Sequence, residues 1–465
     1  MTKDLSNLIK KAESNAFCGP FRQRLHLMPP VGWLNDPNGL CQFHGVYHAF
    51  FQYSPFDPEG GLKLWGHSTS KDMLTWKYQG TALFPDQPFD CTGVYSGCAF
   101  IEQDKMYLYY TGNVKLEDGE YDYIQSGREG NTVLVESSDG MTIGPKKLLM
   151  RNSDYPSNLS CHVRDPKVWK EHGRYYMIQG ARTKDDVGLA IIFSSEDKVN
   201  WTFEKEVKTS YDFGYMWECP DYFETDGHKV LSASVQGLIG GIWKDRNVYQ
   251  SGYFQVNGDL LGDYQLSEYF LWDYGFDYYA PQSFYTEDGR TILIAWMGMP
   301  DCEEYGNQPT IQEGWQHCFT FPREIYAKDG RICQRPVREL DNRMISDTQA
   351  DHRLTIQNQK TYIAKIHGIQ KNNFQANLSG GLFLEYTQGR FQMRFADQKK
   401  EGLSGGRSLR YLELDNLETI TILADVSSVE VFVNNGEAVF STRYYPEFYS
   451  LDIQAEGAHI NFSKL

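Results

Sequence analysis

The sequence lacks the features that would place the protein in a membrane or an oxidising compartment. No run of about 18 apolar residues occurs, so no segment of the 465-residue chain is a candidate membrane span. The nine cysteines are odd in number, and no two have C-x-x-C spacing, which argues against a disulfide framework or a zinc site. Residues 1–17 lack the apolar core of a signal peptide. We therefore expect a cytoplasmic protein with no membrane partner.

Basic residues are scarce relative to acidic ones. The chain has 45 Lys and Arg against 61 Asp and Glu, which gives a formal net charge of -16 and a pI of about 5.2. Nucleic-acid binding needs clustered Lys and Arg, so no nucleic-acid partner is expected. The acidity favours solubility and still allows one local basic pocket.

Aromatic residues, by contrast, are plentiful: they make up 15% of the chain and include 31 Tyr and 10 Trp. Such side chains fill the cores of β-sheets. They also suit a sugar site, because an aromatic face stacks on the C–H faces of a sugar while a polar tip hydrogen-bonds its hydroxyls.

One local pattern recurs along the first two thirds of the chain. A short strand leads through a Gly- or Asp-containing turn into an aromatic-rich strand, which is typical of a β-hairpin. The copies span residues 39–53, 98–112, 167–180, 221–237 and 282–297. Their spacing of roughly 55 to 70 residues suits one four-stranded blade per copy. We therefore predict an all-β chain with a five-bladed β-propeller over residues 21–325.

The pattern changes after the propeller. Residues 381–387, 419–434 and 438–447 alternate apolar and polar side chains, and the Asn-Asn-Gly step at 434–436 favours a hairpin turn. A β-sandwich is therefore predicted over residues 352–465, after a linker at 326–351. Residues 1–20 form an N-terminal extension with a short amphipathic helix. Either a bracing role or a homodimer contact fits the sandwich.

Three of the hairpins follow a carboxylate and a proline, at Asp36, Asp165 and Glu218. Proline restricts the preceding residue to extended geometry and cannot donate in a central ladder. The three acids are thus expected at the same end of equivalent innermost strands, which converge on the propeller axis. A lone Asp-Pro is usually a turn former. Three at matched positions favour a shared site.

Paired carboxyl groups are what glycoside hydrolysis needs. One attacks the sugar or activates water, and the other must carry a proton for the leaving oxygen. Burial and neighbouring negative charge raise the pKa of the second and keep it protonated. Asp36, Asp165 and Glu218 are the candidate set.

A series of short motifs in a fixed order resembles glycoside hydrolase family 32, the β-fructosidases. The motifs are W-L-N-D-P-N-G at 33–39, F-Q-Y at 51–53, W-G-H at 65–67, Y-S-G at 95–97, R-D-P at 164–166, E-C-P at 218–220 and D-Y-G-F-D-Y-Y-A-P-Q at 273–282. The resemblance implies a five-bladed propeller followed by a β-sandwich, in agreement with the repeat. It also implies retaining cleavage of a β-D-fructofuranosyl bond, with no metal or organic cofactor.

The resemblance further implies roles for single residues. Asp36 becomes the nucleophile, Glu218 the general acid and base, and Asp165 an acceptor for fructose hydroxyls. Arg164 either orients Asp165, holds a sugar hydroxyl or makes a structural salt bridge. Core packing is the alternative for each aromatic. The implied substrate-binding residues are Trp33, Leu34, Asn35, Gln52, Trp65, Tyr95, Ser96, Arg164, Tyr279 and Trp296.

The chain departs from the family pattern at Gly60, where many members have a pocket-lining Trp. The G-L-K-x-W stretch at 61–65 and Y-T-G-N-V at 110–114 are similar to the cytoplasmic sucrose-6-phosphate hydrolase branch. Lys63 is then either a contact for the 6-phosphate or a solvated loop lysine, and we favour the solvated lysine.

The expected substrates are small sugars: sucrose 6-phosphate, sucrose or short fructo-oligosaccharides. The alternatives within the same chemistry are an exo-acting inulinase or levanase and a fructosyltransferase. A propeller hydrolase acting on arabinans or xylans and a non-catalytic sugar-binding propeller are the more distant alternatives.

Overall fold

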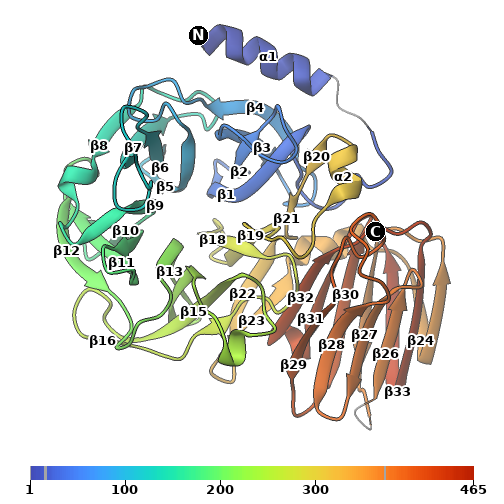
Figure 1. Ribbon diagram of the computed structural model, residues 1–465. Coiled ribbons are helices and arrows are strands. Elements are labelled where there is room, and N and C mark those ends of the chain that lie inside the picture. Colours follow the sequence, from blue (N-terminus) through green and yellow to red (C-terminus); the bar gives the residue numbers. More distant parts are fainter. Residues whose placement is uncertain (1, 15–17, 371–372) are drawn as a thin grey trace.

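Each of the five hairpins forms the first two strands of a propeller blade (Figure 1). The computed structural model describes residues 2–14, 18–370 and 373–465. It confirms the predicted five-bladed propeller followed by a β-sandwich. The first strands of neighbouring blades contact one another in a closed ring, in the order β1, β5, β9, β13, β18 and back to β1. The strands of the first three blades are β1 (Gly32–Phe43), β2 (Val46–Ser54), β3 (Leu64–Ser70) and β4 (Lys77–Leu83); β5 (Val94–Glu102), β6 (Lys105–Lys115), β7 (Arg128–Ser137) and β8 (Lys147–Met150); and β9 (Leu159–Glu171), β10 (Arg174–Thr183), β11 (Gly188–Ser195) and β12 (Thr202–Val207).

The last two blades carry additions to the four-strand plan. In blade four, the short β17 pairs with β15, while an insertion of α2, β20 and β21 interrupts blade five between β19 and β22. Within that insertion β20 pairs with β1 and β21 pairs with β19, so the segment links the last blade to the first and closes the ring. The elements are β13 (Met216–Thr225), β14 (His228–Gln236), β15 (Tyr249–Gly258), β16 (Tyr264–Leu266) and β17 (Phe270–Leu271); and β18 (Tyr279–Tyr285), β19 (Thr291–Met297), α2 (Gln308–Gln312), β20 (Trp315–Gln316), β21 (Cys318–Phe319), β22 (Arg323–Lys328) and β23 (Arg331–Pro336).

The blade-five insertion moves the end of the propeller. The sequence placed that end at residue 325 and a linker at 326–351. In the structure β22 and β23 pair with each other, and β22 pairs with β19, so blade five runs to Pro336. The sandwich begins at β24 (Ile345–Gln357), which leaves only a short connection containing the 3-10 segment Arg338–Arg343.

The sandwich is built around two long strands, β24 and β33 (Ser450–Lys464). They pair along their whole length, and β33 then pairs with β26 through its first half and with β25 through its second half. The two halves thereby extend into two layers, β26-β27-β28-β29 and β25-β30-β31-β32. The remaining strands are β25 (Tyr362–His367), β26 (Phe374–Leu378), β27 (Leu382–Thr387), β28 (Arg390–Phe395), β29 (Leu409–Glu413), β30 (Thr419–Asp425), β31 (Ser428–Val433) and β32 (Ala438–Arg443).

The N-terminal helix α1 (Thr2–Ser14) packs on blade one. Ile9 is buried in the main core, and Glu13 accepts hydrogen bonds from the hydroxyls of Tyr53 (3.2 Å) and Tyr78 (2.7 Å). Within the described ranges, no helix is long and apolar enough to cross a membrane.

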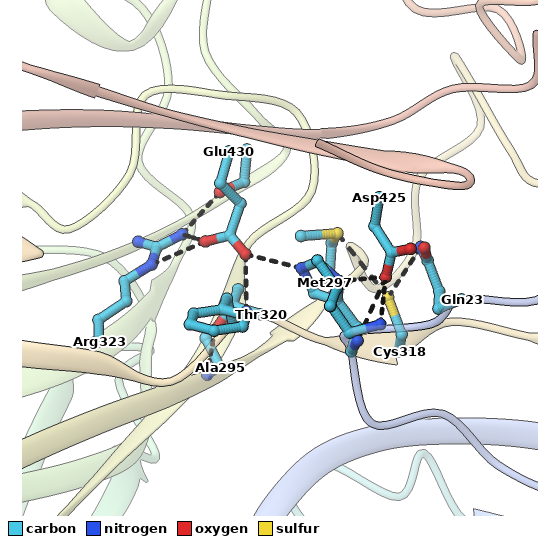
Figure 2. Close-up of polar contacts among 12 residues, drawn as sticks. Gln23, Ala295, Met297, Cys318, Thr320, Arg323, Asp425 and Glu430 are labelled. Atoms are coloured by element: carbon cyan, nitrogen blue, oxygen red, sulfur yellow. Dashed lines mark hydrogen bonds and ion pairs between the residues drawn. The ribbon is translucent and has the colours of Figure 1, made fainter. Parts of the chain in front are cut away.

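A buried charge cluster joins the sandwich to the propeller (Figure 2). Asp425 and Glu430 of the sandwich accept contacts from the two ring nitrogens of His26, at 2.8 and 3.0 Å. Arg323 of β22 reaches Glu430 at 2.5 Å and Asp273 at 3.0 Å. All of these side chains are fully buried, so the contacts replace water that the charges have lost.

Candidate active site

A β-bulge interrupts the innermost strand of every blade at the same level. The pairing shifts register at Leu34/Pro37, Tyr95/Gly97, Arg164/Lys167, Glu218/Asp221 and Tyr279/Gln282. Four of the five bulges contain a proline, which cannot donate to the ladder; the fifth contains Gly97. The predicted acids therefore lie inside the first strands rather than ahead of them. Asp165 and Cys219 have left-handed φ values of 63° and 48°, as the bulges require.

The bulges turn side chains from all five blades into one cavity of about 450 Å³ at the end of the propeller axis. Asp36, Asp165 and Glu218 all line it. The other lining residues are Trp33, Asn35, Gln52, Lys63, Tyr95, Ser96, Arg128, His162, Arg164, Gln236, Tyr279, Trp296, Pro300 and Asp301.

Asp36 is held by hydrogen-bond donors on both carboxylate oxygens. Ser96 Oγ donates to Oδ2 at 2.5 Å, and Asn35 Nδ2 donates to Oδ1 at 3.1 Å. Gln52 fixes the orientation of both donors: its Oε1 accepts from Asn35, and its Nε2 donates to Ser96 Oγ. Burial raises the pKa of Asp36, and the two donors partly offset that rise because they stabilise the carboxylate.

Asp165 lies between Asp36 and the next blade. Its Oδ2 accepts the backbone N–H of Cys219 at 2.9 Å, and the Cys219 thiol lies 3.6 Å from the same oxygen and 3.9 Å from Asp36 Oδ2. Burial raises the pKa of Asp165 to about 7, against the lowering effect of the Arg164 guanidinium. The Cys219 thiol stays protonated, since burial beside these carboxyls raises its pKa well above the usual value.

Glu218 is paired on both oxygens. Arg164 Nη2 donates to Oε1 at 2.7 Å, whereas Tyr279 OH and Gln236 Nε2 donate to Oε2 at 2.5 and 2.8 Å. Arg164 lies farther from Asp165, at 4.0 Å. Its main partner is therefore the glutamate rather than the neighbouring aspartate.

Aromatic side chains form one wall of the cavity. The rings of Trp33 and Trp296 lie 5.7 Å apart, and Tyr279 meets Trp296 edge to face at 6.2 Å. The buried His317 packs edge-on against Trp33 at 4.3 Å and supports the wall from behind. Trp33 Nε1 donates to Asn35 Oδ1 at 2.7 Å, which links the wall to the Asp36 cluster.

Two cations in the cavity lack a carboxylate partner. Lys63 Nζ lies 4.7 Å over the Trp33 ring, and Arg128 Nε is buried without a hydrogen-bond partner. Neither makes an ion pair within the described part of the chain, whereas the buried Arg323 and Arg407 both do. Burial lowers the pKa of Lys63 to about 8 and also lowers that of Arg128.

Lys63 is therefore not the solvated loop lysine that the sequence favoured. Gly60 lies next to this lysine: a Cβ at residue 60 would be in van der Waals contact with Lys63 Nζ at 3.6 Å and with the Trp33 ring at 3.9 Å. Gly60 also has φ = 116°, a conformation that side-chain-bearing residues rarely adopt.

Eight of the ten expected substrate-binding residues line the cavity, and Leu34 and Trp65 do not. Both are fully buried. Leu34 lies between Trp33 and Asn35 on β1, and alternation along a strand turns it to the opposite face. Trp65 instead donates its Nε1–H to the Tyr95 carbonyl at 3.0 Å and so braces a residue that lines the cavity.

Sequence reasoning missed several lining residues: Arg128, His162, Gln236, Pro300 and Asp301. Arg128 begins β7 and Gln236 ends β14, so neither lies in the first-strand motifs that marked the site. His162, however, comes two residues before Arg164, and that proximity was an available signal.

The cavity as a whole combines several carboxyl groups that have different hydrogen-bond partners, an aromatic wall and two cations without an ion-pair partner among the described residues. A sugar could stack on the wall while the carboxyls act on a bond near Asp36 and Glu218.

Comparison with known proteins places both parts of the chain. The pattern of the Glycosyl hydrolases family 32 N-terminal domain matches residues 26–336, and that of the Glycosyl hydrolases family 32 C terminal matches residues 348–465.

Among similar proteins, a sucrose-6-phosphate hydrolase of Bacillus subtilis (strain 168) is 38% identical over 94% of this chain and 92% of its own length. A raffinose invertase of Escherichia coli is also 38% identical, over 93% and 91%. The solved structure of a sucrose-6-phosphate hydrolase from Lactobacillus gasseri superposes with a TM-score of 0.89 at 28% identity, covering 99% of this chain and 96% of that one. A Bombyx mori β-fructofuranosidase gives 0.85 at 26%, covering 100% and 99%.

Proposed function

Since the chain belongs to glycosyl hydrolases family 32, we propose that it is a β-fructofuranosidase that cleaves the terminal fructosyl bond of sucrose 6-phosphate with retention of configuration. Hydrolysis of sucrose-type substrates agrees with the names of its relatives. The observation that carries the proposal is the convergence of Asp36 and Glu218 on one aromatic-walled cavity.

In the proposed first step, the Asp36 carboxylate attacks the anomeric carbon of the fructosyl unit. Glu218 donates its proton to the glycosidic oxygen as the bond to the leaving sugar breaks. The donors Ser96 and Asn35 favour the charged form of Asp36 that this attack requires. In the second step, Glu218 takes a proton from water, and that water releases fructose from the covalent fructosyl-enzyme.

Asp165 has a positioning part in this proposal. Its oxygens face the cavity beside Asp36, and a buried carboxyl group binds sugar hydroxyls strongly where water is excluded. Such contacts accelerate the reaction only to the extent that they strengthen in the transition state.

The positions of Lys63 and Arg128 favour a phosphorylated substrate over plain sucrose. Lys63 and Arg128 are partly buried and make no ion pair among the described residues, and two such cations in a single cavity suit a substrate that brings its own negative charge. A phosphate ester supplies that charge, whereas sucrose does not. Because a charged ester does not cross a membrane unaided, a cytoplasmic location belongs to the same proposal.

The test compares sucrose and sucrose 6-phosphate as substrates of the wild type and of Lys63→Met and Arg128→Met, together with the anomeric form of fructose released at early times. We expect kcat/KM to be higher for the phosphate ester by about 100-fold, and each substitution to lower it by about 10-fold while leaving sucrose within about 2-fold. The preference should weaken as the pH rises through about 8, because Lys63 loses its charge there. Equal kcat/KM values for sucrose and sucrose 6-phosphate would contradict the proposed phosphorylated substrate. Release of fructose with inverted anomeric configuration would contradict the retaining mechanism.

A further inference from the structure

His162 joins the proposed acid/base to a loop of the neighbouring blade. On one side, Arg164 Nη1 donates to His162 Nδ1 at 2.5 Å. On the other, His162 Nε2 lies 3.0 Å from the backbone carbonyl of Tyr123. Arg164 in turn donates to Glu218 at 2.7 Å. A chain of hydrogen bonds thus runs from the Tyr123 carbonyl through the imidazole and the guanidinium to the Glu218 carboxylate.

The partners of His162 allow only one protonation state. A carbonyl oxygen can only accept, so Nε2 must carry the hydrogen, while a guanidinium can only donate, so Nδ1 must be the free acceptor. Burial and the neighbouring arginines lower the pKa of His162 to about 2, which agrees with this neutral tautomer. The imidazole therefore does not titrate where the enzyme would work.

The Tyr123 end of this series of hydrogen bonds is held in place by further hydrogen bonds. Tyr123 lies in the connection between β6 and β7, and its hydroxyl donates to the Leu116 carbonyl at 2.9 Å. The adjacent Ile124 carbonyl accepts the backbone N–H of Cys161 at 2.9 Å, and Asp122 Oδ1 accepts three backbone N–H groups of the same loop. The Tyr123 carbonyl is thus a fixed point from which the imidazole can be oriented.

We propose that His162 is a positioning residue that holds the Arg164 guanidinium against Glu218 and so sets the acidity of the acid/base. This inference rests on the proposed role of Glu218. His162 does not touch that carboxylate and acts through Arg164. Without the Nδ1 acceptor, Arg164 loses one of its two anchors and its charge stabilises the Glu218 carboxylate less.

Other groups around Glu218 also influence its ionisation and must stay constant in a test. The charged and titratable groups facing it are Arg164 and Asp165 on β9, Asp36 on β1, Arg128 on β7, Tyr279 on β18 and the adjacent Cys219. Arg128 and Arg182 face His162 itself, in addition to Arg164.

A matched pair of substitutions isolates the contact with Arg164. His162→Asn places an amide oxygen near the position of Nδ1. His162→Leu introduces a side chain of nearly the same shape as asparagine but without an acceptor. Both variants lose the hydrogen bond to Tyr123 equally. The measurement is the pH profile of kcat/KM, whose alkaline limb reports the general acid of the free enzyme. Thermal unfolding of each variant checks that it remains folded.

For His162→Leu we expect the alkaline limb to move up by about 1 pH unit, because the Glu218 carboxylate loses part of the arginine's stabilisation. For His162→Asn we expect a limb within about 0.3 unit of the wild type. Coincident profiles for both folded variants and the wild type would overturn the positioning role. A wild type that releases no fructose would instead overturn the proposed function.

Discussion

The protein places carboxyl groups away from water in two regions, and their pKa values shift in opposite directions in the two. At the junction of the domains, Asp425 and Glu430 have lowered pKa values, because His26 and Arg323 supply positive charge at hydrogen-bonding distance. In the cavity, Asp36 and Asp165 have raised pKa values, because burial outweighs the donors and the one nearby guanidinium. Burial alone therefore does not decide ionisation, because cations hydrogen-bonded directly to Asp425 and Glu430 reverse its effect there.

Asp273 sharpens this comparison from within the junction. It shares Arg323 with Glu430, and its pKa is raised to about 6. Glu430 also has His26 as a partner, whereas Asp273 has Arg323 as its one cation among the described residues, and the arginine by itself does not offset the burial of Asp273. The junction is a structural cluster with enough cations for two carboxylates. Under the proposed function, the cavity retains acids that are costly to bury because the reaction uses them.

The largest expected effect is on activity in the cavity. Asp36→Asn removes the proposed nucleophile, and kcat/KM should fall by about 10⁴-fold or more. The thermal midpoint should not fall, because the amide removes a carboxylate whose raised pKa shows that the fold disfavours its charge. Activity within 10-fold of the wild type would remove Asp36 from the mechanism.

At the junction, the same kind of change should act on stability instead. Glu430→Gln leaves Arg323 and His26 without their shared carboxylate, and the free energy of unfolding should fall by about 3–5 kcal/mol. Denaturant unfolding measures the loss, and kcat/KM of the folded enzyme should stay within about 2-fold. Glu413→Gln, which breaks an exposed pair with Arg390, is the matched control and should cost less than about 1 kcal/mol. Similar losses of unfolding free energy in Glu430→Gln and Glu413→Gln would contradict the stabilising role of the buried cluster.

Stability curves of the wild type and of His26→Gln against pH isolate the charge of His26 at the junction, because cavity groups titrate equally in both proteins. The pKa of His26 is raised from 6.5 to about 9, so its contribution is complete below pH 6.5 and is lost as the pH rises through about 9. That contribution is about 3 kcal/mol. Wild-type unfolding should therefore show an alkaline loss that His26→Gln lacks. Parallel stability curves would mean that His26 is not charged in the fold.

The smallest predicted effect concerns one donor to Asp36. Ser96→Ala removes the 2.5 Å hydrogen bond to Oδ2, which favours the charged carboxylate. The pKa of Asp36 should rise further, so the acidic limb of kcat/KM should move up by about 0.5–1 pH unit. The alkaline limb, which is assigned to the general acid in the proposed mechanism, serves as the internal control. Movement of both limbs together would point to a general disturbance of the cavity.

The propeller was predictable because its signals are local. Each hairpin combines alternating apolar residues with a turn, and the spacing of the copies repeats. The end of the propeller was not predictable in this way, since the insertion between Met297 and Arg323 interrupts the spacing before the last two strands of blade five.

Most of the predicted site residues that reach the cavity lie on the first strands of the blades, and Gln52 of β2 and Trp296 of β19 are the exceptions. The three acids, each followed by a proline, recur at matched positions, and all three acids reach the cavity. A contiguous motif does not show which of its residues face the cavity, and Leu34 of the W-L-N-D-P-N-G motif faces the core instead. Arg128 arrives from another strand of blade two, and no sequence spacing ties it to the acids.

The most direct test of the account is to identify the residue that carries the fructosyl group. Glu218→Gln, incubated with a fructosyl donor whose leaving group needs no proton, should accumulate the covalent intermediate. Mass spectrometry of its peptides should then find one added hexosyl unit on the peptide containing Asp36. A hexosyl unit on another carboxylate, or turnover with inverted fructose and no adduct, would contradict the assignment of Asp36 as the nucleophile.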